Sequence, residues 1–328
     1  MPVAVIYHAD CPDGFGAALA ARKHFGNSAD YFPMHHGEDW EPLGLTGKSV
    51  YILDFSFARD VLEKIAAQSR AVTQIDHHAS ARAPWASQLK TSANGLETFE
   101  HKELPLNIHF DLNKSGARLS WEHFFPSTPL PLALRHVEDI DMWRFTLPGT
   151  RAFSRALRLL PFDFACWEQL LSETETAESP RYQNMLTQGG AIEQFFGREI
   201  ERLAQSHLVM SATVRGEIID PLQSVRHGQP LLQAEGLGWQ SISGLAINAD
   251  SLFASELGNK LAERSGSFGL IWQLAADGQI KASLRAAGKV DVAAIASRYG
   301  GGGHPNAAGF RMPVEHFITE VLGRNQTA

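Results

Sequence analysis

Histidine and aspartate residues follow three short apolar segments near the start of the chain. The segments cover residues 3–7, 49–55 and 71–76. The polar residues that end or follow them are, in chain order, His8 and Asp10, then Asp54, then Asp76, His77 and His78. Imidazole and carboxylate ligands together suit Mn²⁺, Fe²⁺, Co²⁺ or Zn²⁺ better than Mg²⁺, which favours oxygen alone. The residue types therefore predict a transition-metal site, if the fold brings the three segments together.

The predicted ligands are more numerous than one open catalytic metal requires. They are His8, Asp10, Asp13, Asp54 and His77. Two ions about 3.5–4 Å apart, bridged by one carboxylate, would use the whole set. Such a pair activates a bridging water and neutralises phosphate oxygens during an in-line displacement. Asp54 follows the middle segment and is the predicted bridge.

A second acidic cluster, "VEDIDMW", begins at residue 137. It contains Glu138, Asp139 and Asp141. We expect Glu138 to be a solvated residue at a helix end. A two-metal site needs about one more carboxylate, and either Asp139 or Asp141 supplies it.

Strands that alternate with helices are expected to position these residues. The three segments have the β-branched pattern of buried strands, and residues 14–26 and 58–69 between them are predicted helices. This alternation is typical of a parallel sheet that is covered on both faces. Ligands of such sheets bind beyond the carboxyl ends of the strands. The fold class thus predicts that the polar strand ends converge.

The glycine-rich stretch "YGGGGHPNAAGF" at residues 299–310 is the strongest signal in the second half of the chain. Consecutive glycines let the backbone approach a ligand and expose its N–H groups. The predicted substrate-binding residues here are Gly301, Gly302, Gly303 and His304, with Arg285 as a nearby cation for phosphate. We expect "PNAAGF" to begin a helix, since a glycine-rich loop before a helix holds anions.

The composition is ordinary for a soluble globular protein, with 44% hydrophobic and 20% charged residues among 328. A net charge of −7 argues against a protein that coats long nucleic acid. The only two cysteines, Cys11 and Cys166, form no disulfide framework and indicate a reducing cytoplasm. We expect no signal peptide, and no membrane span, because no apolar stretch reaches about 18 residues.

The chain is expected to divide in its middle. Residues 172–180 are polar, acidic and end in proline, and residues 181–207 carry apolar side chains at helical spacing. From about residue 208 a new series of strands and helices begins. Strands are predicted at 208–214, 242–248, 268–275 and 279–286, with helices at 252–264 and 290–300.

These stretches resemble the motifs of the DHH phosphoesterase superfamily, in the expected order and over nearly the whole chain. "IDHH" is the motif that names that family, "HADCPDGFGAA" looks like its first motif, "LDF" its second and "EDIDMW" its fourth. "GGGGHPNAAGF" looks like the signature of the DHH-associated C-terminal domain. The resemblance implies an α/β protein: a parallel-sheet DHH domain (1–175), a linker helix (176–207) and a smaller α/β substrate-binding domain (208–328).

The resemblance also implies roles for individual residues. His8, Asp10 and Asp54 would hold one metal ion, usually Mn²⁺. Asp13, Asp54, His77 and an acid of "EDID" would hold the other. His78 would polarise the scissile phosphate, Asp76 would orient a histidine, and Arg285 and His304 would grip the substrate.

The chain departs from the family pattern in its first motif. Family members commonly space the two acids as Asp-x-Asp, whereas Cys11 and Pro12 both separate Asp10 from Asp13. In the fourth motif, alignment on different family branches selects either Asp139 or Asp141.

The resulting hypothesis is a cytoplasmic, divalent-metal-dependent phosphohydrolase that acts on short nucleotide substrates, with two Mn²⁺ ions. Oligoribonucleotides, the linear dinucleotide product of a cyclic dinucleotide, and 3′-phosphoadenosine 5′-phosphate (pAp) all fit, whereas long duplex nucleic acid does not. A pyrophosphatase and a non-catalytic nucleotide sensor are the alternatives. A homodimer is compatible with the sequence, which does not define the oligomeric state.

Overall fold

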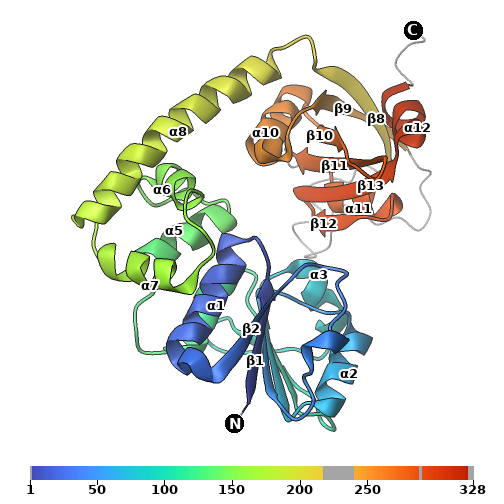
Figure 1. The fold of residues 1–328 in the computed structure, drawn as a ribbon. Coiled ribbons are helices and arrows are strands. Elements are labelled where there is room, and N and C mark those ends of the chain that lie inside the picture. Colours follow the sequence, from blue (N-terminus) through green and yellow to red (C-terminus); the bar gives the residue numbers. More distant parts are fainter. Residues whose placement is uncertain (1, 217–239, 288–289, 324–328) are drawn as a thin grey trace. The chain divides into compact units, whose positions relative to one another are not determined.

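The computed structural model describes residues 2–216, 240–287 and 290–323. The chain forms two compact units, Met1–Gln194 and Phe195–Ala328 (Figure 1). The division falls within the long helix α8 (Pro180–Ala204). The domain boundaries at 175/176 and 207/208 remain a prediction.

A seven-stranded sheet forms the centre of the N-terminal unit, in the order β2-β1-β3-β4-β7-β6-β5. The strands are β1 (Val3–His8), β2 (Ala29–Met34), β3 (Ser49–Leu53), β4 (Ala71–Asp76), β5 (Lys90–Thr91), β6 (Glu97–Glu100) and β7 (Leu106–Phe110). The first five in the spatial order are parallel, and β6 and β5 continue the sheet antiparallel. The predicted segments become the adjacent strands β1, β3 and β4.

Both faces of this sheet are buried, as the apolar strands predict. Val5 and Tyr7 of β1 pack in the core that includes α1 (Pro12–Phe25), whereas Ala4 and Ile6 pack in the core that includes α2 (Arg59–Gln68). Figure 1 shows α1 and α2 on opposite sides of the sheet. The strand ends are therefore fixed between two layers of helices.

Further helices complete the N-terminal unit. They are α3 (Ala79–Arg82), α4 (Gly116–Phe124), α5 (Leu132–Asp141), α6 (Thr150–Leu157) and α7 (Phe164–Glu173). α8 passes very close to α6, because a Cβ on Gly189 would lie 1.7 Å from the carbonyl oxygen of Ala152. The glycine that weakens helix propensity at this point is thus required by packing.

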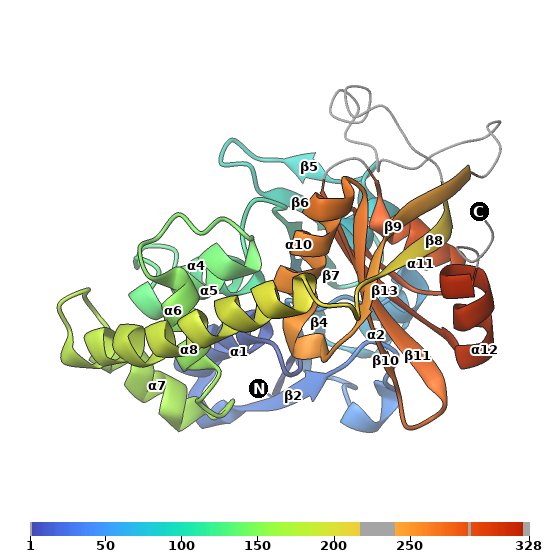
Figure 2. The same cartoon turned by 90° about the horizontal axis from the view of Figure 1, so that it is seen from above.

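A six-stranded sheet in the order β12-β13-β11-β10-β9-β8 forms the C-terminal unit. Its strands are β8 (Met210–Gly216), β9 (Gln240–Asn248), β10 (Phe268–Leu274), β11 (Gln279–Ala286), β12 (Gly302–His304) and β13 (Ala307–Pro313). Its helices are α10 (Ala254–Ser265), α11 (Val292–Arg298) and α12 (Val314–His316). Figure 2 shows α10 and α11 on opposite sides of this sheet. The α/β fold class with a sheet in each half is confirmed.

The predicted helix after the glycine-rich stretch is wrong, because residues 307–313 form β13, which pairs with β11. Ala308, Phe310 and Met312 are buried while the residues between them are more exposed, which is the alternation of a strand. The last two glycines instead belong to β12, which forms an antiparallel hairpin with β13 through a turn at Pro305 and Asn306. No helix among the described residues is long and apolar enough to cross a membrane.

Candidate metal centre

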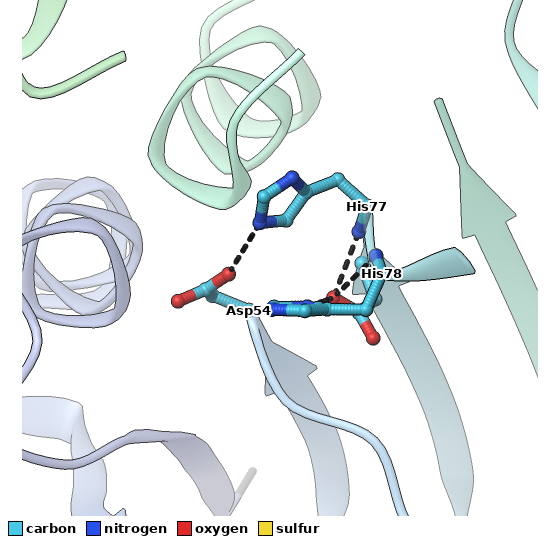
Figure 3. Close-up of side chains that lie close together, drawn as sticks. Asp54, His77 and His78 are labelled. Atoms are coloured by element: carbon cyan, nitrogen blue, oxygen red, sulfur yellow. Dashed lines mark hydrogen bonds and ion pairs between the residues drawn. The ribbon is translucent and has the colours of Figure 1, made fainter. Parts of the chain in front are cut away.

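The ends of β1, β3 and β4 bring His8, Asp54 and His77 together. His8 Nδ1 lies 3.8 Å from Asp54 Oδ2, and His77 Nε2 lies 3.2 Å from Asp54 Oδ1. Figure 3 shows the His77 ring facing the Asp54 carboxylate, with His78 beside it. Asp54 therefore lies between two histidines that are far apart in the sequence, one near each carboxylate oxygen.

Asp54 is held in a costly environment. Its side chain is only 2% exposed, and Oδ1 accepts no hydrogen bond among the described residues. Its backbone φ is +51°, a left-handed conformation that costs energy for a residue other than glycine. Burial raises the pKa of this carboxyl well above its usual range, and the neighbouring Asp13 raises it further. A buried, incompletely bonded carboxylate is the donor that a cation would satisfy.

Asp13 and Asp141 approach the same histidine nitrogen. His77 Nε2 lies 3.7 Å from Asp13 Oδ2 and 3.6 Å from Asp141 Oδ2. Asp13 also accepts hydrogen bonds from the backbone N–H groups of Gly116 and Ala117, which begin α4. Burial, followed by the charge of Asp13, raises the pKa of Asp141 to about 7. Asp13, His77 and Asp141 thus form a group of ligand atoms within 4.8 Å of one another.

Asp76 orients the histidine pair. Its Oδ1 accepts hydrogen bonds from the backbone N–H of His77 and from Nδ1 of His78, each at 2.7 Å, and Ser56 donates to its Oδ2. Burial opposes ionisation of Asp76, yet the hydrogen bond from His78 and the other donors lower its pKa. Burial likewise opposes protonation of His78, but the bond to Asp76 leaves the pKa of His78 raised. Asp76 therefore fixes the orientation of the His78 ring.

The two acids of "EDID" that the sequence left as alternatives occupy different surroundings. The Asp139 carboxylate accepts hydrogen bonds from the backbone N–H groups of Thr146 and Leu147 and from the hydroxyls of Thr146 and Thr150. These hydrogen bonds hold the loop that follows α5 in place. Because Asp141 faces His77 instead, the geometry favours Asp141 as a ligand.

Glu138 corrects a prediction. It is not a solvated residue at a helix end, because it is buried and its Oε2 accepts a 2.9 Å hydrogen bond from Arg118. Arg144 lies 3.6 Å from its other oxygen. A buried carboxylate of this kind needs partners from outside its own helix, and these partners are not visible in the local sequence pattern.

Asp10 is turned away from the metal centre. Its side chain is 81% exposed and pairs with His35 Nε2 at 3.2 Å, and its φ is +53°. Cys11, the next residue, instead offers its sulfur to the group formed by His8 and Asp54. Burial raises the pKa of the Cys11 thiol well above its usual range, and the carboxylates of Asp54 and Asp13 raise it further. Cys11 is a site residue that sequence reasoning did not assign.

Two of the predicted substrate-binding residues, Arg285 and His304, lie in one cross-strand row of the C-terminal sheet. Ala307 of β13 pairs with Arg285 of β11 on one side and with His304 of β12 on the other. Directly paired residues of antiparallel strands point to the same face, so Arg285 and His304 share a face of the sheet. Arg285 Nη2 donates a 2.9 Å hydrogen bond to Ser255 at the start of α10.

The glycines of the hairpin have a structural cause. A Cβ on Gly301 would lie 2.1 Å from the carbonyl oxygen of Gly309, and Gly303 has a φ of +145°. Larger residues would therefore separate β12 from β13. Gly302 has open space around its Cβ position and is the glycine that close packing does not explain.

Residues 246–324 match a protein-family model described as the DHHA1 domain. The C-terminal part of the chain thus matches the DHHA1 domain, which is the domain that the glycine-rich signature predicts for this region. The candidate metal-binding motifs of the first half stand before this domain in the order that the family resemblance implies.

The chain is also similar to individual proteins. It is 27% identical over 323 residues to the uncharacterized protein R106 of Acanthamoeba polyphaga mimivirus, covering 93% of this chain and 66% of R106. The structure of PggH from Vibrio cholerae, a pGpG-specific phosphodiesterase, aligns over 97% of this chain and 96% of PggH, with 14% identity and a TM-score of 0.45. RecJ of Thermus thermophilus, solved with Mn²⁺, aligns over 97% of this chain and 50% of RecJ, with 14% identity and a TM-score of 0.46.

Proposed function

We propose that this chain is a divalent-metal-dependent phosphohydrolase that cleaves phosphoester bonds in short nucleotide substrates. The observation that carries the proposal is Asp54, whose buried and unsatisfied carboxylate lies between His8 and His77. An arrangement that leaves a carboxylate oxygen unbonded inside the protein is expensive unless a cation binds there. The DHHA1 match supports the same class of reaction.

The residues present fit two divalent ions. His8 and Asp54 would hold one, and Asp13, Asp54, His77 and Asp141 would hold the other, with Asp54 as the shared ligand. The donors are imidazole and carboxylate, which suit Mn²⁺. When bound, such ions lower the pKa of water and neutralise the charge that develops on a phosphoryl group.

The remaining residues act on the substrate. Asp76 holds the His78 ring by its Nδ1 and so orients it. In its protonated form, the ring would neutralise a non-bridging phosphate oxygen or position the leaving group. Arg285 and His304, which share one face of the C-terminal sheet, would bind a further phosphate or the sugar. The burial that lowers the pKa of Arg285 indicates a cation held partly out of water, where a phosphate partner is favoured.

The substrate class follows from charge and from the number of binding groups. A net charge of −7 disfavours long nucleic acid, while one row with Arg285 and His304 suits a mononucleotide bisphosphate or a few linked nucleotides. Oligoribonucleotides, the linear dinucleotide pGpG and pAp are therefore the substrates that we propose to compare. Cytoplasmic location is part of the same proposal, on the basis of the sparse cysteines.

The test is hydrolysis by purified protein with Mn²⁺, first of a model phosphodiester and then of pAp, pGpG and longer oligoribonucleotides, compared by kcat/KM. Asp54→Asn and His77→Ala should abolish turnover. Asp60→Asn, an exposed change on α2 at the Asp60–Lys64 pair, is the matched control and should retain it. Binding of the nucleotides without turnover under several metals would instead indicate a sensor. Preferential hydrolysis of pyrophosphate would indicate the pyrophosphatase.

A further inference from the structure

Cys11 takes the place beside the metal centre that Asp10 leaves. Asp10 has a left-handed backbone, and the chain there turns the Asp10 side chain outward to His35. Cys11 then adopts an extended conformation as the residue before α1, with Pro12 at the first helical position. The additional residue between the two acids of the motif therefore exchanges a carboxylate for a thiol at this position.

The sulfur of Cys11 lies in a group with two other potential ligands. Cys11 Sγ, a nitrogen of His8 and an oxygen of Asp54 all lie within 4.8 Å of one another. Cys11 is only partly exposed, and both it and Cys166 are free thiols. The group thus contains one sulfur, one nitrogen and one oxygen donor, from the ends of β1 and β3 and the start of α1.

Asp54 gives an independent indication that this group binds a cation. Its side chain is 2% exposed, and its Oδ1 has no hydrogen-bond donor among the described residues, although His77 Nε2 is 3.2 Å away. A fully buried, unsatisfied carboxylate is rare and costly in a folded protein. Oδ1 faces His77, and Oδ2 lies on the side of His8 and Cys11. A cation on each side of the Asp54 carboxylate would remove that cost, and the group with Cys11 would hold the one beside Oδ2.

We propose that Cys11, rather than Asp10, completes the ligand set of the ion that His8 and Asp54 hold, and that this position selects a thiophilic divalent ion. Sulfur ligands favour Zn²⁺, Fe²⁺ or Co²⁺ over Mn²⁺, which prefers oxygen and nitrogen donors. On binding, the S–H bond of Cys11 breaks, its proton passes to solvent, and a sulfur–metal bond forms without any change of oxidation state. The group of Asp13, His77 and Asp141 contains no sulfur and would keep a preference for Mn²⁺.

This inference rests on the proposed metal-dependent function, and the experiment separates the two. The full-length, reduced, metal-free protein is titrated with Co²⁺, and its absorption is recorded from the near ultraviolet through the visible. A sulfur–cobalt bond gives a near-ultraviolet charge-transfer band, whereas cobalt with only nitrogen and oxygen ligands gives visible bands alone. This readout does not depend on catalytic activity.

Four variants accompany the wild type. Cys166→Ser is the matched control, since it removes the only other cysteine of the sequence. Wild type, Cys166→Ser and Asp10→Asn should all show the charge-transfer band. Cys11→Ser should lose the band and bind Co²⁺ at least ~10-fold more weakly, since even partners of metal ligands contribute 10–100-fold to affinity. Asp54→Asn should lose cobalt binding at this position.

The possible results have distinct meanings. Cobalt binding that depends on Asp54 but shows no charge-transfer band, or a band that persists in Cys11→Ser, would overturn the role of Cys11 and leave the proposed function standing. Absence of cobalt binding by the wild type, or binding unchanged by Asp54→Asn, would overturn the metal centre itself. Circular dichroism of each variant shows whether a lost band is caused by unfolding, and Cys11→Ala provides a second substitution if Cys11→Ser does not fold.

Discussion

Asp139 and Asp141 lie two residues apart, but substitution of each by asparagine should have opposite effects on stability. Asp139→Asn should destabilise the metal-free protein, whereas Asp141→Asn should not. In Asp139→Asn, the new amide nitrogen takes the place of one carboxylate oxygen. If it replaces Oδ2, it faces the N–H of Leu147 and the hydroxyl of Thr150, which both donate to that oxygen now. Each unsatisfied buried donor costs about 1–3 kcal/mol, so the two together predict a loss of about 2–6 kcal/mol in the free energy of unfolding.

The loss should be at the upper part of that range because Thr150 belongs to a chain of bonds. Tyr182 of α8 lies 2.9 Å from Nε2 of His136, and Nδ1 of His136 lies 2.8 Å from the Thr150 hydroxyl. Burial lowers the pKa of His136 to about 4, so the ring is neutral and can accept from Tyr182 while it donates to Thr150. The Thr150 hydroxyl must then donate its proton to Asp139. In Asp139→Asn, this hydroxyl has no other acceptor within the chain of bonds.

Asp141→Asn should instead leave the metal-free protein as stable as the wild type, or make it more stable. The pKa of Asp141 is raised to about 7 from a usual value near 4, so its ionisation in the folded state costs stability, and the cost grows as pH rises through that window. The amide removes this cost. The variant should, however, lose the benefit of Mn²⁺, which at about 100 times its Kd stabilises a binding protein by about 2.7 kcal/mol.

The assay is urea unfolding of wild type and both variants at pH 7.5, with EDTA and with Mn²⁺. Asp139→Asn should unfold at a lower midpoint in EDTA and still gain stability from Mn²⁺. Asp141→Asn should keep at least the wild-type midpoint in EDTA and gain less from Mn²⁺. The reverse pattern, in which Asp139→Asn alone loses the response to Mn²⁺, would refute the choice of Asp141 as the ligand.

Two further predictions concern a helix contact and a pKa. Gly189→Ala should destabilise the protein by about 1–3 kcal/mol, because its Cβ would lie 1.7 Å from the Ala152 carbonyl oxygen. Gly190→Ala has open space around its Cβ and should stabilise the protein by about 0.5–1 kcal/mol. Equal effects of the two substitutions in thermal unfolding would contradict this packing. In metal-free protein, Asp76→Asn should lower the raised pKa of His78, measured by NMR titration, because the bond that stabilises the imidazolium is lost. The stability from this pair is present below the unfolded histidine pKa and is lost as pH rises through the folded pKa, so an unchanged His78 titration would be inconsistent with the pairing.

The strands that carry the candidate metal centre could be predicted because their sequences are continuous apolar runs. β1, β3 and β4 are buried on both faces, and their polar ends are visible as sudden changes of residue type. β2 and β7 were not predicted, since Asp30 in β2 and Asn107 and His109 in β7 interrupt the apolar pattern. Packing and strand pairing of such segments are decided by neighbours that are distant in the sequence.

The positions of the candidate site residues could be predicted where strand order decides them, and could not be predicted where the local backbone conformation decides them. The convergence of His8, Asp54 and His77 follows from strand order. The outward direction of Asp10 and the inward place of Cys11 depend on a left-handed residue, which no residue pattern reveals. The β13 hairpin was mistaken for a helix start because "PNAAGF" contains small residues that are compatible with both structures, until pairing with β11 selects the strand.

The central claim is that Asp54 shares two divalent ions with His8 and His77, and anomalous diffraction tests it most directly. Crystals of the full-length protein grown with Co²⁺, which binds nitrogen, oxygen and sulfur donors, would be measured at the cobalt absorption edge, beside crystals of Asp54→Asn. The account predicts two anomalous peaks within bonding distance of Asp54 in the wild type, one toward His8 and the other toward His77, and neither peak in the variant. Cobalt peaks that lie elsewhere, or that persist unchanged in Asp54→Asn, would contradict it.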